Sequence, residues 1–106
     1  MQLLCFTTYT SSGVSQEIEF PLHPETQSID TVSKIVTELL NTISDCVKDL
    51  DGCKDGDILQ ALSMVMAIRS RMVDIEPETS HKLLMQFIEQ HHQAVLDAKT
   101  QIASRA

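Results

Sequence analysis

The sequence lacks the features that would place a chain in or across a membrane. Its apolar runs fall well short of the ~20 residues that span a bilayer, although hydrophobic residues make up 42% of the chain. Residues 1–6 are apolar, but this run is short and has no basic flank, so we expect no secretory leader. The sequence therefore predicts a cytoplasmic protein that has no membrane partner.

Cysteine and basic residues are both scarce. The three cysteines, Cys5, Cys46 and Cys53, are odd in number and form no Cys-x-x-Cys pair, which favours reduced thiols in the cytoplasm. We expect Cys46 on the inner face of a helix, as an inert apolar side chain. Lysine and arginine total 8 against 15 acidic residues, so the net charge is −7. Nucleic-acid binding needs clustered basic residues, and we therefore expect no direct contact with nucleic acid.

Catalytic signatures are also missing. The sequence has no Gly-x-Ser-x-Gly elbow, no phosphate-binding glycine loop and no His-Glu-x-x-His zinc motif. The acidic segment 49–57 has the composition of a calcium loop, but an EF-hand starting at Asp51 needs a bidentate glutamate where Leu62 stands. We interpret 49–57 as a turn, and we predict a non-enzymatic protein without a metal or a cofactor.

The first part of the chain carries the pattern of two strands. Residues 2–9 are rich in β-branched and aromatic types, and residues 14–20 alternate between apolar and polar side chains. Residues 10–13 between them have a turn composition. The sequence thus predicts a β-hairpin over 2–20, followed by a connector over 21–28.

The rest of the chain shows the three-and-four spacing of apolar residues that is typical of helices. This spacing predicts helices over 29–51, 57–75 and 77–103. Because the links are short, consecutive helices should be antiparallel neighbours that hide their apolar stripes together. The predicted fold is a single, mainly α domain over 1–106, an antiparallel three-helix bundle preceded by an N-terminal β-hairpin.

Several residues indicate where these helices begin and end. Ser28 is a suitable N-cap for the first helix, and Pro77 suits the first position of the third. Asp57 with Gln60 resembles a capping box at the start of the second helix. Gly52 follows the last apolar position of the first helix, where a left-handed C-cap residue is favoured.

Apolar surface exceeds what a minimal bundle needs. Met64 and Met66 cannot face the same way on one helix, and methionine suits adaptable binding surfaces. A two-stranded hairpin is marginal alone, so it must pack on the bundle or pair across a twofold axis in a homodimer. We hypothesise an interface drawn from five apolar residues: Phe6, Ile18, Phe20, Met64 and Met66.

Charged and titratable residues suggest two smaller roles. His91 falls in the inner stripe of the third helix, where it could act as a pH-sensitive packing residue. Arg69 and Arg71 are expected to form surface ion pairs with Asp74 or Glu76.

These observations favour an interaction module, namely an adaptor, a regulator or a chaperone-like protein, that acts on another protein by surface complementarity. We also expect a homodimer. Two alternatives stay open. One is a small-ligand-binding protein or an enzyme with a cleft near His91 and His92, using an acid such as Glu89. The other is an acidic mimic of nucleic acid, which the negative net charge favours.

Overall fold

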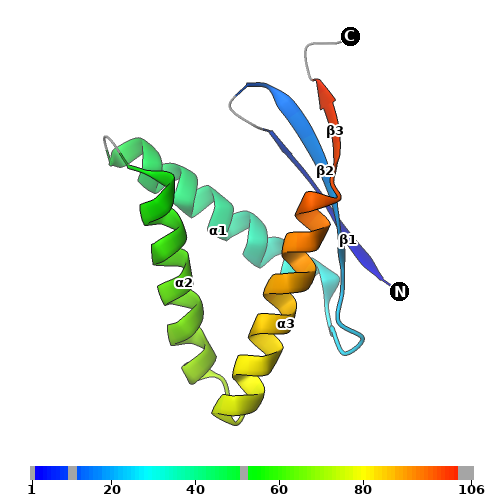
Figure 1. Cartoon of the computed structure of the whole chain (residues 1–106), viewed down its shortest axis with the longest axis vertical. Helices are drawn as coiled ribbons and strands as arrows, with labels where there is room; N and C mark the ends of the chain where they lie inside the picture. Colours follow the sequence, from blue (N-terminus) through cyan, green and yellow to red (C-terminus); the bar gives the residue numbers. More distant parts are fainter. Residues whose placement is uncertain (1, 10–11, 51–52, 103–106) are drawn as a thin grey trace. The chain divides into compact units, whose positions relative to one another are not determined.

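The computed structural model describes residues 2–9, 12–50 and 53–102 (Figure 1). In chain order its elements are β1 (Leu3–Tyr9), β2 (Val14–Pro21), α1 (Ile29–Asp49), α2 (Asp55–Met72), α3 (Pro77–Leu96) and β3 (Lys99–Ile102). The predicted fold class is confirmed, since an antiparallel hairpin precedes three helices.

The chain divides into two compact units. We call residues 1–27 and 85–106 the sheet unit, and residues 28–84 the helical unit. The helix α3 contributes its first turns to the helical unit and its remaining turns to the sheet unit. That the units form one domain, as the length predicts, stays a prediction.

The hairpin forms where the sequence predicts it. β1 and β2 pair antiparallel, with Leu3 opposite Pro21 and Tyr9 opposite Ser15, so β2 extends one residue beyond the predicted boundary. Gly13 precedes β2 with a φ of 83°, a left-handed conformation that glycine adopts without a steric cost. Residues 10–11 of the predicted turn lie outside the described residues.

The sheet has one covered face and one open face. Leu4 and Ile18 lie on the covered face and, with Ala94 of α3, are the buried apolar side chains among the described residues. The neighbours of Ile18 along β2, Glu17 and Glu19, are exposed. This confirms the predicted alternation of β2, because successive side chains of a strand point to opposite faces.

The end of the third helix differs from the prediction. Instead of continuing through 77–103, the helix stops at Leu96, and Lys99–Ile102 form the strand β3. β3 pairs antiparallel with β2, over the stretch from Val14 to Glu17, and makes β2 the central strand of the order β1-β2-β3. The hairpin edge offers backbone N–H and C=O groups that need partners. Pairing with that edge outweighs the weak helical spacing of the last residues.

Two of the three predicted helix starts are confirmed. The Ser28 Oγ accepts a hydrogen bond from the Thr31 backbone N–H at 3.1 Å, which caps α1. Pro77 opens α3, where its missing N–H costs nothing. The predicted capping box at Asp57 is wrong, because α2 starts at Asp55 and its N-cap Lys54 makes no side-chain hydrogen bond.

The first two helices end earlier than predicted. α1 stops at Asp49, and the backbone N–H of Leu50 donates to the Cys46 carbonyl at 2.9 Å, which closes its last turn. α2 stops at Met72, because Val73 adopts an extended conformation. The predicted C-cap Gly52 lies outside the described residues.

Replacing Ser28 with alanine should remove the cap of α1. We expect the free energy of unfolding to fall by about 1 kcal/mol, because a backbone N–H of the first turn loses its acceptor. Urea denaturation followed by circular dichroism measures the change. Ser28→Asp keeps an oxygen acceptor and should retain the stability of the wild type; equal losses in both variants would contradict the capping role.

Candidate functional site

Five ring side chains gather in the sheet unit. We call Phe6, Phe20, His23, Phe87 and His91 the aromatic cluster. The imidazole of His91 stacks on Phe87, with ring centroids 5.7 Å apart and planes 6° apart, and meets Phe20 edge to face at 5.5 Å. Phe20 in turn meets Phe6 at 6.3 Å, and His23 meets Phe87 at 5.8 Å. These offset and edge-to-face geometries are the favourable ones for aromatic pairs.

His91 lies where sequence analysis placed it, among apolar side chains. It is half-buried, and burial lowers the pKa of its imidazole below the ordinary value, since desolvation disfavours the charged form. A neutral imidazole therefore suits the folded state. The role of His91 as a pH-sensitive packing residue stays a prediction.

The lowered pKa of His91 sets the sign of a pH effect. The unfolded state binds a proton near the ordinary pKa of about 6.5, whereas the folded state resists it. The stabilisation from neutral His91 is thus fully present above about pH 6.5 and is lost as the pH falls below it. In urea titrations at about pH 7.5 and about pH 5.5, His91→Gln should weaken this acid-induced loss. His92 is exposed, so His92→Gln is the control. Identical pH profiles for wild type and His91→Gln would contradict the prediction.

The predicted hairpin interface is used inside the chain. Phe6 and Phe20 are half-buried and contact other rings of the aromatic cluster. Ile18 is only 6% exposed, so it belongs to the core of the sheet unit and offers no surface to a partner. Within the chain, the apolar face of the hairpin contacts α3 through Phe20 and His91, and the second edge of β2 pairs with β3. Pairing of the hairpin across a twofold axis in a homodimer stays a prediction.

His23 is a member of the cluster that sequence analysis missed. It lies in the connector after β2, where its Nδ1 accepts a hydrogen bond from the Glu25 backbone N–H at 3.1 Å. No periodic pattern links a connector residue to Phe87 of α3. Only the folded chain brings the two rings together.

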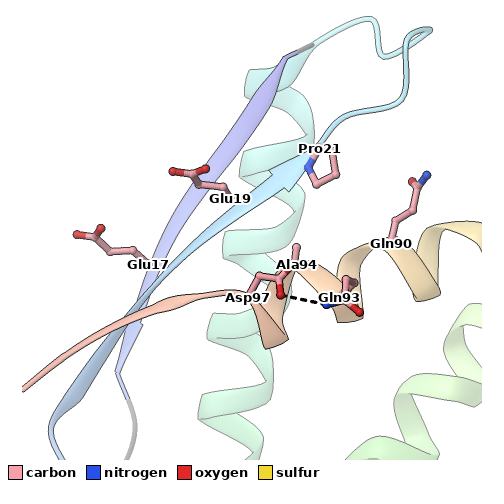
Figure 2. A pocket seen from close by; sticks show the side chains of 7 residues that line it. All are labelled: Glu17, Glu19, Pro21, Gln90, Gln93, Ala94 and Asp97. Carbon is pink, nitrogen blue, oxygen red and sulfur yellow. Dashed lines mark hydrogen bonds between the residues drawn. The ribbon is translucent and has the colours of Figure 1, made fainter.

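The sheet unit has a cavity of about 280 Å³, and no residue of the aromatic cluster lines it. Its seven lining residues are Glu17, Glu19, Pro21, Gln90, Gln93, Ala94 and Asp97. Figure 2 shows the two glutamate carboxylates pointing away from α3, and a hydrogen bond of 3.0 Å from the Gln93 amide to Asp97. The acidic groups therefore do not converge on one point.

A second cavity of the sheet unit, about 790 Å³, is lined by connector residues such as His23 and by Gln86 and Gln90 of α3. Neither of these two cavities is lined by His91 or His92. Both are lined by Gln90, which precedes His91 in the sequence, so the alternative of a catalytic or ligand-binding cleft near these histidines stays a prediction.

The helical unit presents a different surface. Every residue of α1 and α2 is described, and neither helix has a buried residue. Their apolar stripes are present, as the spacing predicts, but many of the large apolar residues in them are exposed and not hidden between the helices. The exposed large apolar residues of the two helices are Ile35, Leu39, Leu40, Val47, Leu59, Met64, Val65, Met66, Ile68 and Met72. We call this surface the apolar face.

An open groove of about 550 Å³ runs along the apolar face. α1 contributes Leu39, Ile43 and Val47 to it, and α2 contributes Ile58 and Val65, among others. Such a groove fits the apolar side chains of a partner helix, which recur at the same spacing.

Of the other predicted residues, the two cysteines of the helical unit line this groove, whereas Met64 and Met66 do not. Met64 and Met66 are 55% and 37% exposed, so both are accessible for the predicted interface. Cys46 lines the groove but is exposed, which corrects the prediction of a buried position, because the described residues of the helical unit leave its side chain uncovered. Cys53 lines the same groove.

Within the described residues, no three histidine, cysteine, aspartate or glutamate side chains come together as metal ligands would. Within the same residues, no helix has the length and apolarity needed to cross a membrane.

Comparisons with known proteins do not add to these observations. No family model, no curated protein and no solved structure matches the chain.

Proposed function

We propose that this protein is a non-catalytic interaction module that binds a helix of another protein chain through the apolar face of α1 and α2. The observation that carries the proposal is the absence of any buried residue in either helix. Isolated helices are marginal in water, and most helical stability in proteins comes from the packing of an amphipathic face. The two helices therefore need a cover.

The chemistry of the groove supports a protein partner. Its lining is largely aliphatic, with Leu39, Ile43 and Val65 among the contributors. Exposed apolar patches of this kind mark protein interaction sites. Met64 and Met66, on different sides of α2, can adapt to the partner's side chains. An adaptor, a regulator or a chaperone-like protein would use such a surface, and the three free cysteines suit the reducing cytoplasm.

A matched pair of variants tests the proposal. Val65 lines the groove, whereas Gln60 is an exposed residue of the same helix that does not line it. Tagged wild type, Val65→Lys and Gln60→Lys are compared by quantitative mass spectrometry of the proteins that each recovers from native lysate. We expect Gln60→Lys to retain the partners of the wild type and Val65→Lys to lose them, because a lysine in an apolar contact leaves a charge unpaired. The same partners in all three samples would refute the proposal.

A further inference from the structure

The charges of α2 are divided between its two ends. Asp55 and Asp57 lie in the first turn, and Arg69 and Arg71 lie in the last turn. The stretch from Ile58 to Ile68 carries no charge. The helix dipole favours these signs at these ends, but it requires neither the long uncharged stretch nor the exposure of its apolar side chains.

The arginines of α2 lack the partners that the sequence predicts. Within the described residues, no carboxylate lies within ion-pair distance of Arg69 or Arg71, so the expected pairs with Asp74 or Glu76 are not formed. Arg69 instead contacts the sulfur of Met72 at 3.7 Å. Both guanidinium groups are therefore available to carboxylates of another chain.

The apolar surface of α2 is too wide for α1 to cover alone. α1 and α2 share the groove lined by Ile58 and Val65, yet Leu59 and Met64 are also exposed, at 67% and 55%. At about 100° per residue, Leu59 and Met64 lie roughly 140° apart around the helix axis. A helix that is apolar over so much of its circumference is normally buried against more than one neighbour.

We infer that the chain covering α2 is a second copy of this protein, with the two α2 helices packed antiparallel about a twofold axis near Ser63. This inference rests on the proposed function and names its partner. Ser63 lies midway between the acidic and the basic turn. An antiparallel pair centred there sets the acidic turn of each copy beside the basic turn of the other, with apolar side chains of the two uncharged stretches in contact.

The charges also match along each side of this pair. Asp57 and Arg71 are fourteen residues apart in the sequence, and so are Asp55 and Arg69. Because fourteen residues make nearly four full turns, the two members of each pair lie within about 40° of each other around the helix axis. A twofold axis brings like sides of the two helices together. One side therefore joins Asp57 to Arg71 of the second copy, and the other joins Asp55 to Arg69. A parallel pair would instead set acidic turn against acidic turn.

Charge reversal tests this arrangement in the full-length chain. Sedimentation equilibrium should give the wild type a mass about twice the 11.8 kDa of one chain. The double variant Arg69→Asp with Arg71→Asp places four acidic groups at each contact, and we expect its dimer to be weaker by about tenfold or more. Asp55→Arg with Asp57→Arg should weaken its own dimer in the same way. Mixing the two double variants should restore a dimer, because each then meets its complement.

A matched control removes the same charges from α1. Lys34→Asp with Lys48→Asp changes the net charge equally, away from α2, and should leave the dimer as strong as in the wild type. A monomeric wild type, reversed variants that stay dimeric, or a mixture that stays monomeric would each overturn the inference. If the wild type is monomeric while Val65→Lys still loses its lysate partners, the proposed function stands and only the second copy is refuted.

Spin labels keep the test valid if a reversed variant fails to fold. In a chain whose three cysteines are replaced by serine, labels are attached at Ser63→Cys or at Gly56→Cys, and a side chain at Gly56 meets no neighbouring atom. In the antiparallel pair, two labels at position 63 lie at the same height, whereas labels at position 56 are separated along the axis by about 21 Å. Equal inter-copy distances at both positions would contradict the antiparallel arrangement.

Discussion

Replacing Phe20 with alanine is expected to lower the free energy of unfolding by about 3 kcal/mol, which lowers the melting temperature by about 10 °C or more. Phe20 links the hairpin to α3, because its ring contacts both Phe6 and His91 at centroid distances of 6.3 and 5.5 Å. Truncation removes both contacts and leaves a cavity beside Ile18. Thermal denaturation followed by circular dichroism measures the effect.

Two further variants control for aromatic content and for volume. Tyr9 is a strand residue that is 70% exposed, so Tyr9→Ala should change the stability by no more than about 0.5 kcal/mol. Phe20→Leu keeps most of the volume and should cost only about 1 kcal/mol. A loss from Tyr9→Ala as large as that from Phe20→Ala would show that the ring contacts of Phe20 carry no special weight.

Replacing Val65 with lysine is expected to cost about 3 kcal/mol in the purified protein. Val65 is 51% exposed in the single chain, and a residue that faces water tolerates lysine well. A large cost therefore arises only if a second chain covers the apolar face and the new ammonium group must leave water. Urea denaturation of the purified protein gives the free energy of unfolding.

Gln60→Lys provides the comparison for Val65→Lys. Gln60 is exposed and lies on the same helix. Both variants therefore introduce a lysine, with the same helix propensity, into the same helix. We expect Gln60→Lys to stay within about 0.5 kcal/mol of the wild type. Equal and small effects at both positions would mean that water, and not protein, covers the apolar face.

Local chemistry made the helices predictable from the sequence. Ser28 and Pro77 fix the starts of α1 and α3, because a side-chain oxygen or a missing N–H acts within a few residues of the helix end. The capping box predicted at Asp57 was wrong because the start of α2 has no side-chain cap. The first turn of the helix therefore begins earlier, at Asp55. Helix boundaries without a capping side chain leave little trace in sequence.

Long-range pairing explains what the sequence could not reveal. The strand β3 exists because β2 offers it an edge, and the residues of β3 alone do not indicate where that edge lies. The aromatic cluster is similar: His91 was predictable from its stripe, but the contact between His23 and Phe87 joins a connector to a helix. The apolar stripes of α1 and α2 were predictable as well, whereas their exposure depends on which chain covers them.

The order of strands in the sheet bears on how fast the protein folds. β1 and β2 are joined by a short turn, so their hairpin can close within about 10 μs. β3 must wait, because Ile102 reaches Val14 only after the whole helical unit has been spanned, and closing such a long loop costs conformational entropy. In refolding experiments, the β1–β2 amides should therefore gain protection from hydrogen exchange before the amides shared by β2 and β3. Lengthening the chain within the helical unit should slow only that second step, and only weakly, because loop-closure entropy grows with the logarithm of loop length.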